Sequence, residues 1–322
     1  MKRFLKHIVI GLLIFAGVNL ILVVIYEYPV YKAIKNKTHR NYLKWNDIHT
    51  NKNSYDLVII GSSRAYTAYN PVVIDSALQL KSYNMGTSSQ DIVESYYTLK
   101  EVFDYQKPKY VVFDVFFPCS DDLLDYYQIF SNASFFESNK RKLELVTQGY
   151  GSSGVLNYTI PLVKYRNYIK QDIGGLFSDN KTPRKEDNWI RGYLNDSSVV
   201  SKEKIEHFNP ISNYQNVNFD ASRFQTYLKK IKDLAEANNA QLICLRSPYP
   251  PSRLALSETD DEKLYFEEHI DPKTAVFYDL NSYKTVEKYI YTDQDFADYH
   301  HPNISGAKKA SAQLVDIIKA KL

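Results

Sequence analysis

The stretch YDLVIIGSSR, residues 55–64, decides the fold of this chain. Its first six residues form a largely apolar run that is too short for a helix and predicts a buried strand. The next four, Gly61 to Arg64, predict a tight turn at the end of that strand. Asn70 and Pro71 then predict a helix start, because Asn is a favoured cap and Pro fits the first helical turn. A buried strand followed closely by a helix is typical of a parallel α/β sheet.

The same alternation continues along the chain on both sides of a long interruption. Strands are expected at 81–86, 109–117, 241–246 and 275–280, and helices at 89–104, 223–238 and 305–322. Five strands that alternate with helices predict a three-layer, flavodoxin-like α/β sandwich with a five-stranded parallel sheet. The interruption, at about 120–218, is rich in Tyr, Asn, Ser and Lys, and we expect it to be an insertion over one face of the sheet.

One transmembrane helix is predicted before this domain. Ile8 to Tyr26 (IVIGLLIFAGVNLILVVIY) is a run of nineteen residues without a charge. As a helix it spans about 28 Å, close to the hydrocarbon thickness of a bilayer. A secretory signal would have a shorter apolar core and a small-residue cleavage site, so we expect a retained signal anchor. Its single amide, Asn19, is expected to be tolerated there, with contact to a partner helix as the alternative.

The charges that flank the anchor set its expected orientation. Basic residues lie on both sides of it: Lys2, Arg3, Lys6, Lys32, Lys35, Lys37 and Arg40. The positive-inside rule is therefore nearly balanced. The very short N-terminal tail favours a cytoplasmic N-terminus and an extracytoplasmic main domain, in a single-pass protein of the plasma membrane. The expected organisation is a tail and anchor at 1–26, a stalk at 27–53 and one α/β domain at 54–322.

The composition excludes several classes of function. The 322 residues include 40 basic and 37 acidic ones, a net charge of +3, which is too balanced to predict nucleic-acid binding. Cys119 and Cys244 are expected to be small buried residues, and a disulfide between them cannot be inferred from sequence. No CxxC motif or His/Cys cluster is present, so we expect neither a metal site nor a cofactor. The 28 tyrosines are expected to serve in packing, with a glycan-contacting surface as the alternative.

Residues with catalytic potential gather where a parallel sheet binds ligands, outside the carboxyl ends of its strands. Gly61–Arg64, Asn84–Thr87 and the segment from Asp298 to Asn303 are all expected at that edge. A serine becomes a nucleophile when an imidazole takes its proton and a carboxylate orients the imidazole. The residue types fit this arrangement: Ser62 or Ser63, His300 or His301, and Asp298. Backbone N–H groups of Ser63 and Gly86 are expected to line an oxyanion hole.

Three segments resemble the conserved blocks of the SGNH (GDSL-like) hydrolase and acyltransferase superfamily. They are LVIIGSSRAYTAYNP (57–71), YNMGTSSQ (83–90) and DYHHPNISGA (298–307). The resemblance assigns Ser63 as nucleophile, His301 as base and Asp298 as its carboxylate, with His300 as a neighbour. It gives Gly86 as the glycine of the second block and Asn303 and Gly306 as a supporting pair. Gly61 and Arg64 are also expected to support the site.

The resemblance is strongest to the membrane-anchored cell-envelope branch, which includes the extracytoplasmic protein of teichoic-acid D-alanylation and alginate acetylation proteins. It implies serine-dependent acyl transfer or ester hydrolysis on a cell-envelope polysaccharide. The implied partners are a glycan or acyl ester substrate, the lipid bilayer and a multi-spanning membrane O-acyltransferase.

The chain departs from the family at the third block, Gly-x-Asn-Asp. The third strand here ends FDVFFPCSDD (113–122), without that Asn. Because one missing oxyanion donor costs about a hundred- to thousand-fold in rate, a second hypothesis is a weak or inactive protein that keeps the fold to bind an envelope glycan or a membrane acyltransferase. A nucleotide-binding protein is disfavoured, because Gly61-Ser62-Ser63 is not a phosphate-cradling loop.

Two arginines at the same edge have open roles. Arg64 follows the nucleophile, and Arg246 ends the fourth strand. Either is a candidate to hold an anionic substrate or to pair with Asp114 or Asp298. Pairing is favoured for Arg246, whereas Arg64 is a candidate for both roles.

Overall fold

The computed structural model contains a five-stranded parallel sheet, which confirms the α/β class predicted from sequence. The structure describes residues 1–35, 39–115, 120, 124–166, 168–170, 188–201, 203, 218–255, 261–282 and 289–321. The strands are β1 (Leu57–Gly61), β2 (Ser82–Asn84), β3 (Tyr110–Asp114), β6 (Gln241–Arg246) and β7 (Phe277–Asp279), in the order β2-β1-β3-β6-β7. All four pairings are parallel. The chain order therefore reverses between β1 and β3, where open α/β sheets bind ligands.

Both faces of the sheet are buried, which is why its strands are apolar throughout rather than alternating. Successive side chains of a strand point to opposite faces. Val58 and Ile60 of β1 accordingly join one apolar cluster, and Leu57 and Ile59 join the other.

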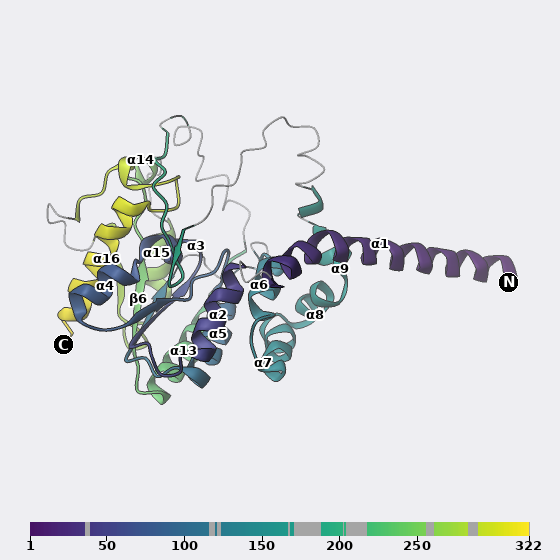
Figure 1. Cartoon of the computed structure of the whole chain (residues 1–322), viewed down its shortest axis with the longest axis horizontal. Helices are drawn as coiled ribbons and strands as arrows, with labels where there is room; N and C mark the ends of the chain where they lie inside the picture. The colour runs from purple at the N-terminus through teal and green to yellow at the C-terminus, as the bar shows by residue number, and fades with distance from the viewer. Residues whose placement is uncertain are drawn as a thin grey trace.

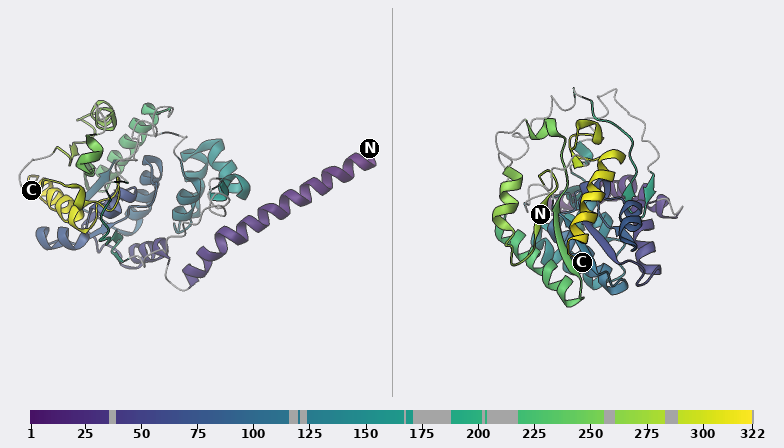
Figure 2. Two further views of the ribbon diagram at one scale, coloured as in Figure 1. Left: turned by 90° about the horizontal axis from the view of Figure 1, so that it is seen from above. Right: turned by 90° about the vertical axis from the view of Figure 1, so that its left-hand side faces the viewer.

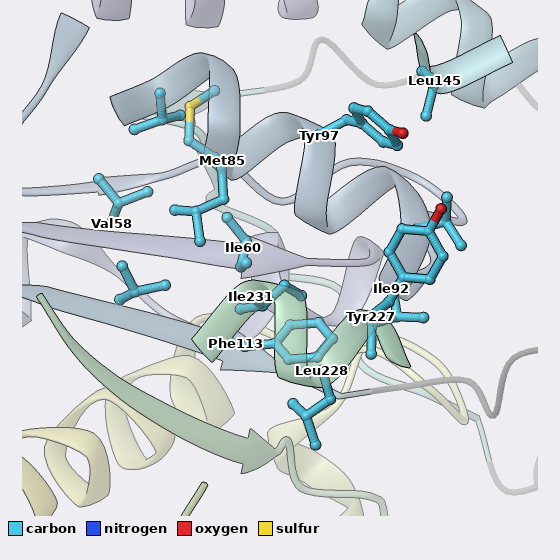
Figure 3. Packing of buried hydrophobic residues seen from close by; sticks show 14 of the residues in the cluster. Val58, Ile60, Met85, Ile92, Tyr97, Phe113, Leu145, Tyr227, Leu228 and Ile231 are labelled. Atoms are coloured by element: carbon cyan, nitrogen blue, oxygen red, sulfur yellow. The ribbon is translucent and has the colours of Figure 1, made fainter. Parts of the chain in front are cut away.

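Helices cover the two faces as separate layers, as Figure 2 shows from two directions. The first face carries α2 (Arg40–Thr50), α5 (Ile92–Tyr105), α13 (Ala221–Ala237) and α15 (Asp261–His269). The second face carries α3 (Ser63–Ala68), α4 (Pro71–Leu78) and α16 (Ile304–Lys319). In the core of the first face, Ile60 and Phe113 of the sheet meet Ile231 and Leu228 of α13 (Figure 3).

Helix caps place the helix starts close to the sequence-based bounds. Asn70 caps α4 by accepting a hydrogen bond from the Val72 N–H at 2.9 Å, as predicted. Helix α5 begins at Ile92 instead of Ser89, because the Asp91 carboxylate accepts from the Glu94 N–H at 2.7 Å and caps the helix there.

The thiol of Cys244 is buried, and burial raises its pKa to about 12. Cys119 lies outside the described residues.

The described part of the insertion consists of short helices and one hairpin. They are α6 (Tyr126–Ala133), α7 (Asn139–Glu144), a π-helical turn (Leu145–Gly149), α8 (Gly151–Thr159), α9 (Pro161–Lys164) and the strands β4 (Trp189–Ile190) and β5 (Tyr193–Leu194). Ile129, Phe130 and Leu145 pack into the cluster of the first face, so this part lies against the α2–α5 side of the sheet.

Helix α1 (Lys2–Lys35) projects from the rest of the molecule as a long rod (Figure 1). Within the described residues, it is the one helix long and apolar enough to cross a membrane. Its apolar part covers Lys2–Tyr28, and its side chains are largely exposed.

Helix α2 differs from the stalk that the sequence predicts for 27–53. Trp45 and Ile48 of α2 are fully buried in the first-face core. The Trp45 indole N–H donates to Asn132 Oδ1 at 2.9 Å, and the Gln106 side-chain amide donates to the Ile48 carbonyl at 2.6 Å. The segment 40–50 is therefore part of the α/β domain, and a stalk at these residues is excluded.

We predict that Trp45→Ala lowers the free energy of unfolding by about 3–5 kcal/mol, as expected for loss of a fully buried aromatic side chain. Chemical denaturation of the full chain in detergent measures this. Leu43→Ala on the same helix, where the side chain is 45% exposed, is the matched control and should change stability by about 0.5 kcal/mol or less. Equal, small effects at both positions would contradict the placement of α2 in the core.

Candidate active site

The turn between β1 and α3 presents Ser63. Gly61 has φ +143°, and a Cβ there would lie 2.7 Å from the Asp114 carbonyl oxygen, so only glycine fits. Ser62 is buried and caps α3, its hydroxyl accepting from the Arg64 N–H at 3.3 Å. Ser63 is consequently the first residue of α3 and is partly exposed, whereas Ser62 is fully buried.

The loop before α16 is closed on itself. A bridge pairs Phe296 with Pro302, and the Ala297 N–H donates to the His301 carbonyl at 2.8 Å. Asn303 caps α16 with its side-chain oxygen, which accepts from the Ser305 N–H at 2.9 Å. A Cβ at Gly306 would collide with the Asp295 carbonyl, so the predicted supporting residues Asn303 and Gly306 fix how this loop meets its helix.

Ser63, His301 and Asp298 form one hydrogen-bonded line. Ser63 Oγ lies 2.8 Å from His301 Nε2, and His301 Nδ1 lies 2.8 Å from Asp298 Oδ2. The side chains of His301 and Asp298 are 27% and 38% exposed, so the line is open to a ligand. With His301 neutral, the consistent assignment is that Nδ1–H donates to Asp298 while Nε2 accepts from the Ser63 hydroxyl.

The Asp298 carboxylate is held ionised. Burial opposes its charge, but the hydrogen bond and charge of His301, together with the backbone N–H groups of His300 and His301, lower its pKa to about 2. These N–H groups lie 2.7 and 2.9 Å from Asp298 Oδ1. A fixed carboxylate on Nδ1 selects the tautomer whose Nε2 can accept a proton.

His300, the other histidine of the pair, is held away from the serine. Its Nδ1 lies 2.5 Å from Arg253 Nη1 on α14 (Pro251–Leu254). Burial and the charge of Arg253 lower the pKa of His300 to about 2. His300 is therefore neutral and accepts from Arg253, and the structure brings His301, not His300, to Ser63.

The two expected oxyanion donors differ in their availability. The Ser63 N–H occupies the first position of α3, where no intrahelical acceptor exists. The Gly86 N–H instead donates to Asn84 Oδ1 at 3.0 Å, so this expected donor is already engaged. Residues 116–119 and 121–123, where the third block of the resemblance would fall, lie outside the described residues.

Asn84 and Lys44 fix the loop that carries Gly86. The Asn84 side-chain amide donates to the carbonyl of Ala65 on α3 at 2.8 Å and to that of Tyr69, the residue after α3, at 3.0 Å. Lys44 of α2 is buried and donates to Thr87 Oγ1 at 2.6 Å and to the carbonyls of Met85 and Gly86 at 3.2 and 3.3 Å. Burial, with the nearby charge of Arg40, sets the pKa of Lys44 well below its ordinary range.

Arg64 and Arg246 are structural residues. Arg64 is fully buried, donates to the carbonyls of Ser247 and Pro248, and stacks on the Tyr249 ring at 3.6 Å. Arg246 pairs with Glu262 at 2.8 Å and with Asp279 at 3.4 Å.

The partners expected for these two arginines were therefore wrong. Arg64 pairs with Glu262 at 3.9 Å, and neither arginine forms an ion pair with Asp114 or Asp298. Arg64 has no exposed surface in the structure.

Asp114 has a different partner, at the end of β3. It accepts from the Ser247 N–H at 2.9 Å and from the Ser247 hydroxyl at 2.8 Å. Burial raises the pKa of Asp114 to about 6, against the opposing influence of the Arg64 charge and the Ser247 hydrogen bonds. The contact ties the ends of β3 and β6 together beneath the site.

Sequence reasoning missed several of these supporting residues. Asn84 lies in the second block of the resemblance, but from the sequence only Gly86 was assigned a role there. Lys44 lies in the predicted stalk, although Asn41, Lys44, Trp45 and Ile48 recur at a helical spacing. Two of those four are polar, so the apolar pattern alone did not reveal the buried face. Arg253 carried no sequence signal that we recognise.

Comparisons with known proteins give distant structural likenesses. Neither a family model nor a curated protein matches the chain. The chain is similar to a GDSL-like lipase from Bacteroides thetaiotaomicron, with 9% identity, TM-score 0.43 and coverage of 88% of this chain and 99% of that one. It is also similar to a mutant acetyl-xylooligosaccharide esterase from Geobacillus, with 11% identity, TM-score 0.40 and coverage of 83% and 95%.

A third similar structure is the psychrotrophic esterase EstA from Pseudoalteromonas sp., with 12% identity, TM-score 0.35 and coverage of 83% and 98%. Likenesses at this distance do not establish a family, so the function rests on the residues of the site itself.

If the Asp298–His301 contact orients the base, Asp298→Asn should lower the turnover of an activated ester by about a thousand- to ten-thousand-fold with the fold intact, because an amide favours the wrong imidazole tautomer. Steady-state kinetics with a p-nitrophenyl ester measures this. Asp293→Asn, in the 3₁₀ turn Asp293–Asp295 of the same region, is the control and should retain activity. A comparable loss in both variants would contradict the orienting role.

Proposed function

We propose that this chain is an SGNH-type serine hydrolase or acyltransferase. The observation that carries the proposal is the hydrogen-bonded line Ser63–His301–Asp298, formed by residues from the two ends of the α/β domain. Such a line of hydroxyl, imidazole and carboxylate supports ester hydrolysis through a serine nucleophile.

The reaction would proceed through an acyl-enzyme. Ser63 Oγ attacks the ester carbonyl carbon while its proton passes to His301 Nε2, and the resulting imidazolium is stabilised by Asp298. The C–O bond of the ester breaks as His301 returns the proton to the leaving alcohol. Water, or a second hydroxyl, then gives its proton to His301 and attacks the acyl carbon. The bond between that carbon and Ser63 Oγ breaks as His301 returns the proton to Ser63 Oγ.

The oxyanion would be held chiefly by the Ser63 N–H. The Gly86 N–H becomes a second donor only if Asn84 releases it. Loss of one donor lowers turnover by about a hundred- to thousand-fold. This engaged donor favours the second candidate function, a catalytically weak SGNH-fold protein that binds an envelope glycan or a membrane acyltransferase.

We further propose that the α/β domain lies outside the cytoplasm, next to the membrane. α1 acts as a retained signal anchor with its N-terminus in the cytoplasm, and a multi-spanning O-acyltransferase is the proposed acyl donor partner. Contacts between α1 and the domain support retention: Lys164 of α9 pairs with Glu27 at 2.7 Å, and the Tyr165 ring stacks on Tyr26 at 4.6 Å. Cleavage of α1 would remove these contacts.

A polysaccharide is proposed as the ester-bearing substrate or the acyl acceptor. Tyr66 lies one helical turn after Ser63, on the same side of α3. Its ring contacts Trp189 of β4 at 5.2 Å, and the Arg40 guanidinium lies 4.7 Å from both rings. Partly exposed aromatic rings with polar partners suit the apolar faces and hydroxyls of a sugar.

For the nucleophile, we expect a fluorophosphonate probe to label the full chain in detergent. Ser63→Ala should abolish the labelling, because its hydroxyl contacts His301. Ser62→Ala, the adjacent control, should keep it, because Ser62 is buried and serves as a helix cap. In-gel fluorescence reads out both variants, and undiminished labelling of Ser63→Ala would refute the assignment.

For the glycan surface, Trp189→Ala should raise KM for an acetylated oligosaccharide about tenfold, which corresponds to 1.4 kcal/mol of lost contact. The same variant should hydrolyse p-nitrophenyl acetate with an unchanged kcat/KM, because that substrate is too small to reach the ring. Initial-rate kinetics with the two substrates separates these outcomes. Equal losses on both substrates would argue that Trp189 supports the fold and not the glycan.

A further inference from the structure

The corner between α8 and α9 lies along the second half of α1 (Figure 1). Three contacts align along α1. The Leu162 N–H donates to Asn19 Oδ1 at 2.9 Å, the Tyr165 ring stacks on Tyr26, and Lys164 pairs with Glu27. The contact therefore extends over nine residues of α1, from Asn19 to Glu27, or about 12 Å of helix.

The depth of this contact is unusual for a soluble domain. The uncharged stretch of α1 ends at Tyr26, and Asn19 precedes that end by seven residues. At 1.5 Å per residue, the Asn19 side chain lies about 10 Å inside the span. If α1 crosses a bilayer, the backbone of Leu162 is at the level of the hydrocarbon of the outer leaflet. The amide that sequence analysis treated as tolerated therefore has a partner from the domain, not from another transmembrane helix.

At the start of α9, every backbone N–H group has a hydrogen-bond acceptor within the protein, as a lipid environment requires. The first N–H groups of a helix have no intrahelical acceptor, and in hydrocarbon each must find one. Pro161 has no N–H, and the Leu162 N–H is taken by Asn19. The N–H groups of Val163 and Lys164 both donate to the Ile160 carbonyl at 3.0 Å. No donor in this first turn depends on water.

The outer surface of the corner is apolar. The nine residues from Val155 to Val163, VLNYTIPLV, include no charged residue. Five of them are exposed: Val155, Leu156, Tyr158 and Leu162, at 41%, 47%, 52% and 39%, and the polar Thr159. The polar ones are bonded locally: Asn157 to Ser153 and Arg166, and Thr159 to the Val155 carbonyl. An apolar patch continuous with a membrane helix is costly in water and favourable in lipid.

Groups typical of a membrane boundary gather at the end of the same contact. Tyrosines and charged residues prefer the headgroup level. Around Tyr26 the structure places Tyr165 at 4.6 Å and Tyr168 at 6.3 Å, and Tyr127 contacts both of these rings. The ion pair of Lys164 with Glu27 lies at this level as well.

We propose that the α8–α9 corner is a second membrane-inserted element, which enters the outer leaflet beside α1. The occupant of its apolar surface is lipid. This inference rests on the proposed retention of α1 as an anchor, and it adds that the domain is attached at two places and does not swing freely on a single helix. Burial of about 5–10 Å into the headgroup and acyl boundary is the usual depth of such an element.

The test uses the full chain in phosphatidylcholine–phosphatidylglycerol vesicles, with one environment-sensitive fluorophore per variant. The labelled variants are Leu156→Cys and Leu162→Cys in the corner, Val18→Cys in α1 as the membrane reference, and Val72→Cys on α4, which is 49% exposed, as the matched control. All carry Cys119→Ser, since Cys244 is buried. Lipid-attached nitroxides and aqueous iodide are the two quenchers.

We expect the labels at 156 and 162 to be quenched several-fold more by lipid nitroxide than the label at 72, and to resist iodide. Iodide quenching at 156 and 162 equal to that at 72, with position 18 still in lipid, would overturn the second insertion. If the apolar surface instead binds a protein partner, iodide should also quench the labels at 156 and 162, because the vesicles contain no protein other than this chain.

The anchor and the activity are distinguished in the same samples. A label at position 18 that is open to iodide would overturn both the anchor and the insertion. Lipid quenching at 156 and 162 in protein that the fluorophosphonate does not label would support the insertion while refuting the proposed hydrolase.

Discussion

The hydrogen bond between Ser63 Oγ and His301 Nε2 joins residues that are 238 positions apart in the chain. It can form only because the parallel sheet brings the end of β1 and the loop before α16 to one edge. At the end of β1, position 61 must be glycine because a side chain there would collide with the backbone of Asp114 on β3. Ser62 is buried and caps α3. Ser63 is therefore the serine that faces this edge of the sheet. The candidate chemistry therefore depends on the fold that brings these two residues together.

Buried polar groups make this edge rigid. Asn84 links the second strand to α3, Lys44 holds the carbonyls of the loop after β2, and Asp114 binds Ser247 across the ends of β3 and β6. Each of these groups would be costly to bury alone, at about 1–3 kcal/mol or more for an unsatisfied partner. Their mutual satisfaction explains why polar residues can lie in the core of an apolar sheet. It also engages the Gly86 N–H, which leaves the Ser63 N–H as the available one of the two expected oxyanion donors.

Much of this architecture could be predicted from sequence, because short apolar runs and helical periodicity report burial directly. Those patterns predicted the five parallel strands and the Asn70 cap. Residues whose role depends on three-dimensional neighbours could not be found in this way. The buried face of α2 carries Asn41 and Lys44 beside Trp45, so its segment was interpreted as a stalk. The ion-pair partners of Arg64 and Arg246 differ from the candidates Asp114 and Asp298, because Glu262 and Asp279 reach these arginines only through the fold. The contact of Asn19 with Leu162 likewise joins residues that no local pattern connects.

The central claim is that Ser63 carries an acyl group during turnover. Mass spectrometry of the full chain, quenched in acid during hydrolysis of an activated acetate ester, tests this most directly. The account predicts one added acetyl group per chain on the peptide that contains Ser63, and none on that peptide in His301→Ala. Ester hydrolysis without a covalent adduct, or an acetyl group that lies on another residue and persists unchanged in His301→Ala, would contradict it.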